Sequence, residues 1–135
     1  MQTLSALACE AILAAGLVSE DRIGIQAVEY SDTDGLARIA VLEGTTDIEE
    51  SQFKAIYQTT PLTILCVAPT RTEAVVLGHQ AASAVYRHLN RLAVTKKGGI
   101  LAVSRTGQSD EMKADSITNH HEAQRNFSVI HTINL

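Results

Sequence analysis

The chain is poor in aromatic residues, prolines and cysteines. Phenylalanine, tyrosine and tryptophan together make up 4% of its 135 residues, and tryptophan is absent. Because apolar residues still account for 45% of the sequence, the core must consist mainly of alanine, valine, isoleucine and leucine. The length fits one domain over residues 1–135, and a core of such small side chains leaves room for further burial in an assembly.

Positive charge is also scarce. The 11 lysines and arginines are outnumbered by 15 aspartates and glutamates, which gives a formal net charge of −4. A broad nucleic-acid-binding face needs clustered lysines and arginines to neutralise phosphates, and this chain offers only Lys96-Lys97 and scattered arginines. The composition therefore argues against such a face, and an acidic surface would repel DNA.

Long hydrophobic runs and targeting signals are missing as well. No apolar stretch approaches the ~20 residues of a membrane-spanning helix, and the first residues lack the positive region of a signal peptide. Cys9 and Cys66 each lie in an apolar run, which favours buried thiols over a disulfide. We therefore expect a cytoplasmic protein with no membrane partner.

The motifs of catalysis and cofactor binding are absent from the sequence. It contains no GxSxG nucleophile elbow, no GxxxxGK or GxGxxG phosphate loop and no EF-hand ladder. The five histidines show neither the HxH nor the HxxxH spacing of a metal site. We predict no catalytic, cofactor-binding or metal-binding residues, and a protein that is not an enzyme.

Two segments have the apolar period of helices. The first runs from Leu4 to Ala15, with Thr3 or Ser5 as its cap and Gly16 at its end. The second runs from Arg71 to Val94 and begins at Thr70-Arg71-Thr72-Glu73, which has the spacing of a capping box. Its apolar stripe consists of Ala74, Leu77, Ala81, Val85, Leu89 and Leu92, and Lys96, Lys97 and a left-handed Gly98 are expected to end it.

The predicted strands surround the long helix in sequence. The segments predicted as strands are 23–30 and 36–42, joined as a hairpin by the turn at 31–35, then a central strand at 61–68, and finally 100–104 and 126–133, which are expected to pair with each other as a hairpin. Phe127, Val129 and Ile133 lie on one face of the last predicted strand. Residues 43–60 are interpreted as a connection. The fold class is thus α+β, with a mostly antiparallel or mixed sheet of four to five strands. The N-terminal helix and the long helix are expected to pack on one face of this sheet.

A polar stretch separates the last two predicted strands. Residues 105–125 have no clear apolar period, and a stretch of this kind inside a compact domain is often functional or disordered. We expect it to project from the sheet, to be mobile in the free protein and to become ordered in an assembly, since its mixed charges suit a register-setting contact. The candidate interface residues are Arg105, Asp110, Glu111, Met112, Lys113, Asp115, Ile117, His120, His121 and Arg125.

The order of these segments resembles the tail terminator, or tail-completion, proteins of long-tailed bacteriophages. The resemblance rests on the strand from Tyr57 to Val67, which leads through Ala68-Pro69-Thr70 into the long capped helix that ends near Lys96-Lys97-Gly98-Gly99. It continues through the polar stretch into the terminal strand 125–131, and the N-terminal helix also fits. It covers most of the chain at the level of element order.

The resemblance implies a structural virion protein. Such proteins form a ring, typically of six copies, that caps the finished tail tube and joins the tail to the head. The implied partners are copies of the chain itself, the tail tube and sheath proteins, and a head-closure or neck protein. Genomic DNA would only pass through the lumen, so acidic side chains are expected there, with Asp47, Glu49 and Glu50 as candidates.

Other interpretations of the same residues remain open. The acidic cluster at 47–50 also has the composition of an ordinary solvated turn. The chain could be another connector of the head-to-tail region, such as a head-closure protein. It could also be a small-molecule-binding regulatory domain, which would require a concave pocket with convergent polar groups.

Overall fold

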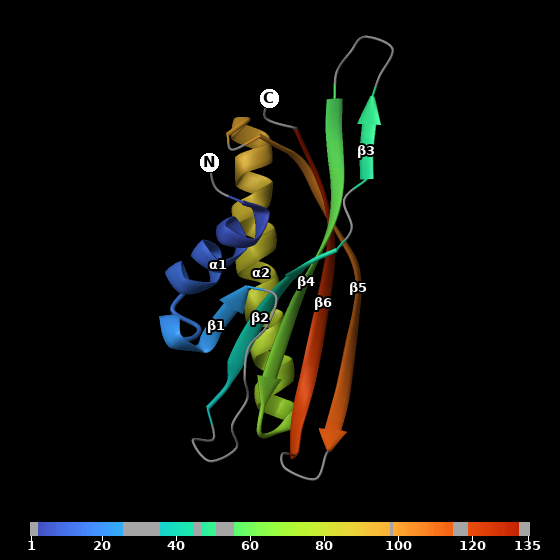
Figure 1. The fold of residues 1–135 in the computed structure, drawn as a ribbon. Coiled ribbons are helices and arrows are strands. Elements are labelled where there is room, and N and C mark those ends of the chain that lie inside the picture. Colours follow the sequence, from blue (N-terminus) through green and yellow to red (C-terminus); the bar gives the residue numbers. More distant parts are fainter. Residues whose placement is uncertain are drawn as a thin grey trace.

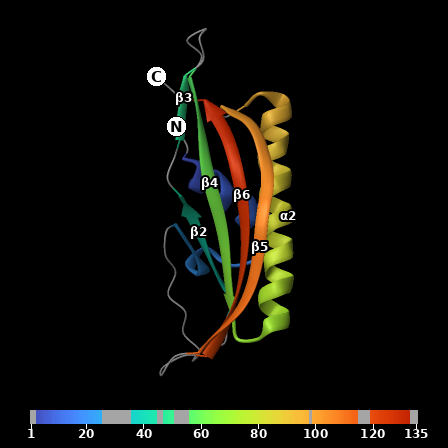
Figure 2. The same cartoon turned by 90° about the vertical axis from the view of Figure 1, so that its right-hand side faces the viewer.

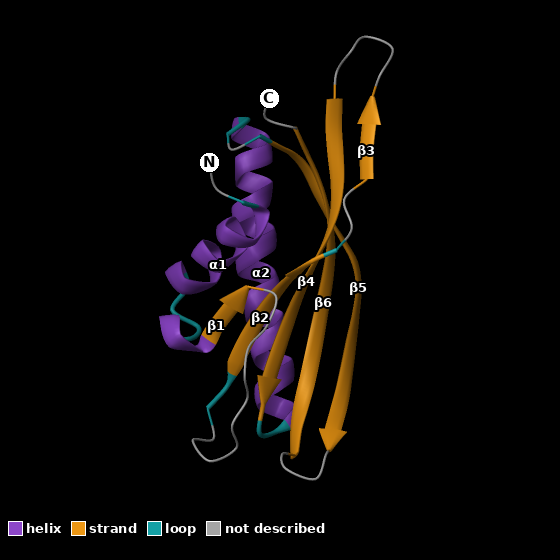
Figure 3. Cartoon of the chain, viewed as in Figure 1, coloured by secondary structure: helices purple, strands orange, loops and turns teal. Residues whose placement is uncertain are grey.

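The computed structural model describes residues 3–25, 36–44, 47–50, 56–97, 99–114 and 119–132 (Figure 1). In these ranges the helices are α1 (Leu4–Ala14), a short 3-10 helix (Glu20–Arg22) and α2 (Arg71–Thr95). The strands are β1 (Ile23–Ile25), β2 (Arg38–Glu43), β3 (Asp47–Glu50), β4 (Ile56–Ala68), β5 (Ile100–Ala114) and β6 (Asn119–Thr132), as Figure 3 shows by colour.

The strands form one mixed sheet with both helices on the same face. Its main path has the order β1-β2-β4-β6-β5, and β3 pairs with the first residues of β4. The β1–β2 pair is parallel and all other pairs are antiparallel. Figure 2 shows α2 to the right of the strands, next to β5, and α1, in blue, behind the strands. The predicted α+β class, with an N-terminal helix and a long helix packed on the sheet, is confirmed.

Helix α1 is fixed to the sheet through its first turn. The Thr3 side chain accepts a hydrogen bond from the Ala6 amide at 3.1 Å, so Thr3 is the cap. Ser5 has a different role, because both its amide and its hydroxyl donate to the Glu43 carboxylate at the end of β2. A carboxylate is also favoured at a helix N-terminus by the helix dipole. The chain leaves the helix at Gly16, whose φ of +69° fits the predicted end.

Helix α2 begins as predicted and ends differently. The Thr70 hydroxyl accepts from the Glu73 amide at 3.2 Å, but the return bond from the Glu73 side chain is not formed in the described residues. At the other end the left-handed cap is Lys96, with φ 57°, two residues before the predicted position 98. The Lys97 amide donates to the Leu92 carbonyl at 2.9 Å, and the Lys96 amide donates to that of Ala93, which is the Schellman arrangement. Gly98 lies outside the described residues.

The core lies between the helices and one face of the sheet. The predicted α2 stripe is buried from Ala74 to Leu89, whereas Leu92 is half-buried. It packs against every second residue of β4, including Leu62, Ile64 and Cys66, which are all fully buried. This alternation is what a strand produces when only one of its faces is covered by helices.

The predicted hairpin between the first two strands is wrong. β1 contains only three residues, and it pairs with β2 in parallel, with Ile23 opposite Ile39. The alternation of Ile23 and Ile25 carries no information on the direction of the neighbouring strand, and in the structure Ile23 is half-buried while Ile25 is 51% exposed. The predicted turn at 31–35 lies outside the described residues.

Two polar segments that were not predicted as strands are paired in the sheet. Residues 47–50 and 56–60, assigned to a connection, form β3 and the start of β4. The stretch 105–125 is not an excursion, because β5 extends to Ala114 and β6 begins at Asn119. The pairing of the last two predicted strands as a hairpin is correct, but the hairpin is much longer. Backbone hydrogen bonds to a distant partner hold these residues, so no apolar period is needed to specify them.

Candidate functional site

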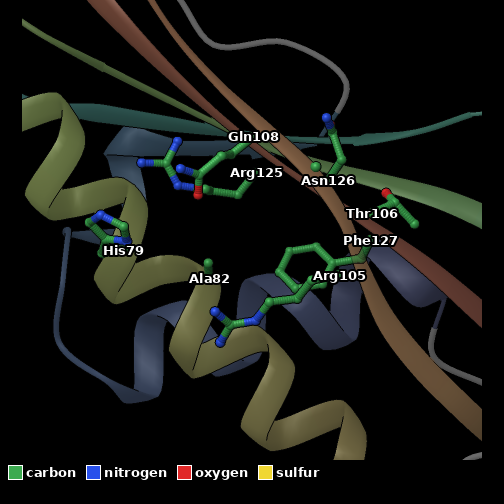
Figure 4. A pocket seen from close by; sticks show the side chains of 9 residues that line it. His79, Ala82, Arg105, Thr106, Gln108, Arg125, Asn126 and Phe127 are labelled. Carbon is green, nitrogen blue, oxygen red and sulfur yellow. The ribbon is translucent and has the colours of Figure 1, made fainter.

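The β5–β6 hairpin and α2 enclose a cavity of about 320 Å³. His79 and Ala82 line it from the helix. Residues 105–108 line it from β5, and residues 125–127 line it from β6 (Figure 4). The fold thereby brings together Arg105 and Arg125, the first and last residues of the polar stretch that the sequence singled out. This cavity is the candidate functional site.

Arg125 is buried because of its position in β6. Every second side chain of β6 faces α2, namely those of Ala123, Arg125, Phe127 and Val129. The Arg125 side chain is only 4% exposed. Its Nη1 donates to Asp110 Oδ1 and to the Gln124 carbonyl, each at 2.8 Å. Asp110 lies opposite Ala123 on β5, and its side chain is 23% exposed. Arg125 therefore belongs to the buried layer between the helix and the sheet. The sequence analysis had placed it among the interface residues instead.

A glycine in the middle of α2 makes room for this guanidinium. A Cβ at Gly78 would lie 3.1 Å from the Ala123 Cβ and 3.2 Å from both Cζ and Nη2 of Arg125. Real Cβ contacts are seldom this short, so a larger residue at position 78 would push the helix or the arginine away. Gly78 therefore sets how closely α2 approaches β6.

Two of the three guanidinium nitrogens of Arg125 are not used. Its Nε and Nη2 are buried and have no hydrogen-bond partner within the described residues. A buried donor without an acceptor costs roughly 1–3 kcal/mol, and most such groups in native proteins are paired. These two nitrogens are therefore the clearest sign that the site accommodates something beyond its own side chains.

The second arginine of the cavity is exposed and rests on an aromatic ring. The guanidinium carbon of Arg105 lies 5.0 Å from the centroid of the Tyr86 ring on α2, within the range of a cation–π contact. Figure 4 shows the Arg105 side chain extending from β5 toward Ala82. Tyr86 thus positions a solvent-accessible positive charge at the cavity, because stacking limits the orientations of the guanidinium.

The remaining candidate interface residues are spread along the far half of the hairpin. His120 lies 3.1 Å from Glu122 through its Nε2 atom, and both side chains are mostly buried. His121 is half-buried and lies opposite Met112. Glu111, Met112 and Lys113 are placed in β5 by their backbone, and Asp115 and Ile117 lie outside the described residues.

The candidate lumen residues lie at the other end of the sheet. Asp47, Glu49 and Glu50 belong to β3, which pairs with residues 56–59 of β4 and so forms a strand rather than a turn. The far end of the hairpin pairs with the opposite end of β4, where Ala68 faces His121. Figure 1 shows β3 at the top of the molecule and the far ends of β5 and β6 at the bottom. The two groups of candidates therefore do not form one surface.

Neither cysteine has the properties of a nucleophile. Cys66 is fully buried, and burial raises the pKa of its thiol to about 12, although the nearby positive charge of Arg125 opposes this shift. Cys9 is half-buried, and partial burial also raises its pKa. A thiol with a raised pKa carries little thiolate at neutral pH. The predicted buried thiol is confirmed for Cys66, and both cysteines are free.

In the described ranges no three histidine, cysteine, aspartate or glutamate side chains are grouped so as to hold a metal ion. Within the same ranges no helix is long and apolar enough to cross a membrane. No family model matches the chain, and neither does any curated protein sequence.

Sequence reasoning missed the contacts that build the cavity, although two signals pointed to them. Phe127 and Val129 were placed on one face of the last strand, and extending this alternation backwards puts Arg125 on the same covered face. Gly78 stands alone in a strong helix, where a glycine often marks close packing. The Arg105–Tyr86 contact had no comparable signal, because it depends on where α2 crosses β5.

Proposed function

We propose that this protein is a tail terminator of a long-tailed bacteriophage. In this role it forms a ring, typically of six copies, that caps the tail tube at the head-proximal end of the virion and joins it to the head. The observation that carries the proposal is the order of the elements. An N-terminal helix, a central strand leading into a long capped helix and a closing hairpin succeed one another over most of the chain.

The two sides of the domain also suit ring assembly. A ring requires heterologous contacts, in which one surface of a copy meets a different surface of the next. Here one side of the sheet carries the helices, while the other side presents half-buried polar side chains such as Thr63, Asn126 and Ser128. Two chemically different surfaces are thus available for neighbouring copies.

The proposed partners follow from this role. They are further copies of the chain, the tail tube and sheath proteins, and a head-closure or neck protein. Genomic DNA passes through the lumen without specific binding, in keeping with the net charge of −4. The β5–β6 hairpin is the proposed contact element. Its distal third carries mixed charges and lies away from the part of the core that α1 covers.

A shortened hairpin tests the proposed contact. Glu111 and Glu122 face each other in register, so Met112–His121 can be replaced by the two-residue turn Asn-Gly. This variant retains the Asp110–Arg125 pair, and we expect it to fold, with a melting temperature near that of the wild type. We expect it not to join tails to heads when it replaces the wild-type protein, as scored by electron microscopy of particles.

A second variant separates the strands from the tip. Replacing residues 115–118 by Gly-Ser-Gly-Ser keeps β5 and β6 at full length, so tail joining should persist if the strand ends make the contact. Normal joining by the Asn-Gly variant would contradict the role of the hairpin. A stable dimer in place of a ring, both in solution and on assembled tails, would contradict the proposed function itself.

The cavity supports a second candidate function, the binding of a small molecule. Its volume and its convergent polar groups meet the minimum requirement for such a site. A regulatory domain would bind its ligand in the isolated protein, whereas a tail terminator requires only its protein partners. Ligand binding by an isolated protein that fails to assemble on tails would favour this second candidate over the tail terminator.

A further inference from the structure

The unused edge of Arg125 has the geometry of an anion receptor. Nη1 is occupied by Asp110 and Gln124, while Nε and Nη2 lie together along one side of the planar guanidinium. Two parallel N–H groups on such an edge match the two oxygens of a carboxylate or a phosphate. The edge without a partner is therefore the one that binds oxyanions in a bidentate manner.

Gly78 lies over the plane of the guanidinium and not at this edge, although Nε and Nη2 are themselves buried. A Cβ added at this glycine would lie equally far, at 3.2 Å, from Cζ and from Nη2. If this Cβ approached Nη2 within the plane of the guanidinium, it would lie clearly farther from Cζ than from Nη2. The equal distances therefore place the glycine above that plane. The helix thus holds the guanidinium flat without occupying its donor edge.

We propose that the cavity between α2 and the β5–β6 hairpin binds a small oxyanion, a carboxylate or a phosphate. In the bound state Arg125 donates from Nε and Nη2, and the exposed Arg105 provides a second positive charge from the other side of the cavity. This inference does not depend on the proposed role in the tail, because it rests on the geometry of a single chain.

The charges of the site agree with a ligand of this class. Arg105 and Arg125 contribute two positive charges and Asp110 one negative charge, so the formal sum is one excess positive charge with His79 neutral. Asp110 neutralises only the Nη1 side of Arg125, and a ligand on the opposite edge would lie away from that carboxylate. One excess positive charge beside the buried guanidinium of Arg125 favours a small anion over a neutral or cationic ligand.

Binding requires one side chain to move. Nε and Nη2 of Arg125 are shielded from solvent, whereas Gln108 and His79, which line the same cavity, are exposed. Gln108 lies opposite Arg125 in the β5–β6 register and lines the same cavity, so we expect rotation of its side chain to open the approach to the guanidinium from the strand side. Exposed side chains change rotamer rapidly, so the movement does not limit access.

Titration of the isolated full-length chain with inorganic phosphate and with succinate tests the proposal. Sodium chloride at matched ionic strength is the reference for screening. We expect both anions to raise the melting temperature above the chloride reference in a saturable manner, because a ligand that binds only the folded state stabilises it. We also expect the amide signals of Gly78 and Gln108 to shift in NMR spectra along the same saturation curve.

Two single substitutions locate the site. Arg105→Gln removes the exposed charge without touching the core, and we expect it to weaken anion binding by at least about tenfold. Arg71→Gln, in the exposed first turn of α2 and outside the cavity, changes the net charge equally and should leave the binding curve unchanged. As a further check, Gln108→Glu places a carboxylate beside Arg125 and should abolish binding of the added anion.

The outcomes separate the sources of the oxyanion. If the natural ligand is a free anion, Arg105→Gln alters only the titration. If the natural ligand is a carboxylate from a neighbouring copy, Arg105→Gln also lowers the mass of the assembly, and added phosphate competes with assembly. The result for a free anion and the result for a neighbouring carboxylate both support the site. The proposal is overturned if phosphate and succinate act no differently from chloride, or if Arg105→Gln and Arg71→Gln titrate alike.

Discussion

The two faces of the sheet are built from the same strands and have different requirements. On the face covered by the helices, Leu62, Ile64 and Val129 are fully buried, and almost every position is apolar. On the other face, Thr63 and Ser128 alternate with them and remain half-buried. Among the described residues of these strands, Thr60 and Arg125 are the buried polar ones, and only Arg125 is charged. The surroundings of Arg125 show what a charge between the helix and the sheet requires. It needs a partner of opposite charge, here Asp110, and a helix residue without a side chain, here Gly78, that leaves space for it.

The largest expected effect comes from placing an unpaired charge on the covered side. Val85 is fully buried on α2, and Val85→Asp should destabilise the fold by about 4 kcal/mol or more, because no partner is available for the carboxylate. The matched control is Val76→Asp on the same helix, where the native side chain is 48% exposed and the change should cost less than about 1 kcal/mol. Thermal and urea unfolding measure both, and equal effects would mean that the two sides of α2 are not distinct.

Removing the partner of Arg125 should have the next largest effect. Asp110→Asn leaves the buried guanidinium uncompensated, and we expect a loss of about 2 kcal/mol. This is less than for a fully buried pair, because the Asp110 side chain is 23% exposed. Arg125→Met in the same chain should recover most of the loss, since an apolar side chain needs no partner. A double-mutant cycle in urea measures the coupling, and additive effects would show that the pair is not coupled.

Closing the space at Gly78 should have a smaller effect. Alanine favours a helix by about 1 kcal/mol over glycine, but its Cβ would lie too close to Ala123 and Arg125. Because Asp110 holds the guanidinium in place, we expect Gly78→Ala to lower the stability by about 1 kcal/mol in spite of the propensity gain. In an Arg125→Met background the penalty should shrink or change sign. A stabilised single variant would show that the arginine moves freely.

The smallest effect concerns the thiol on the covered face. The pKa of Cys66 is raised from its ordinary 9.0 to about 12 by burial, so the native thiol should resist alkylation at about pH 8, while the half-buried Cys9 reacts slowly. Below pH 9 the Cys66 thiol is protonated in both the folded and the unfolded chain, so the raised pKa does not change the stability there. Between about 9 and 12 only the unfolded chain loses this proton, so stability falls as the pH rises. Urea unfolding of wild type and Cys66→Val at about pH 8 and 10.5 measures this difference.

The strongest local patterns of the sequence predicted their elements correctly. Thr70 caps α2, the stripe from Ala74 to Leu89 is buried, and Gly16 ends α1, because each of these features is decided by residues within one or two helical turns. The alternation in the last strand likewise identified Phe127 and Val129 as core residues. Local periodicity is thus sufficient wherever one face of an element is covered by apolar neighbours.

Tertiary structure alone decided which strands pair and what happens to the polar residues. Residues 105–114 and 119–125 have no apolar period, yet they are paired in the β5–β6 ladder, because backbone hydrogen bonds between strands do not depend on side-chain type. The parallel direction of β1 likewise has no signal in three residues. The cavity needs α2, β5 and β6 together, since Arg125 becomes buried, paired and partly unsatisfied only when the helix crosses it at Gly78. The sequence by itself therefore determined the elements of the core, and the crossing of the helix over the hairpin created the site.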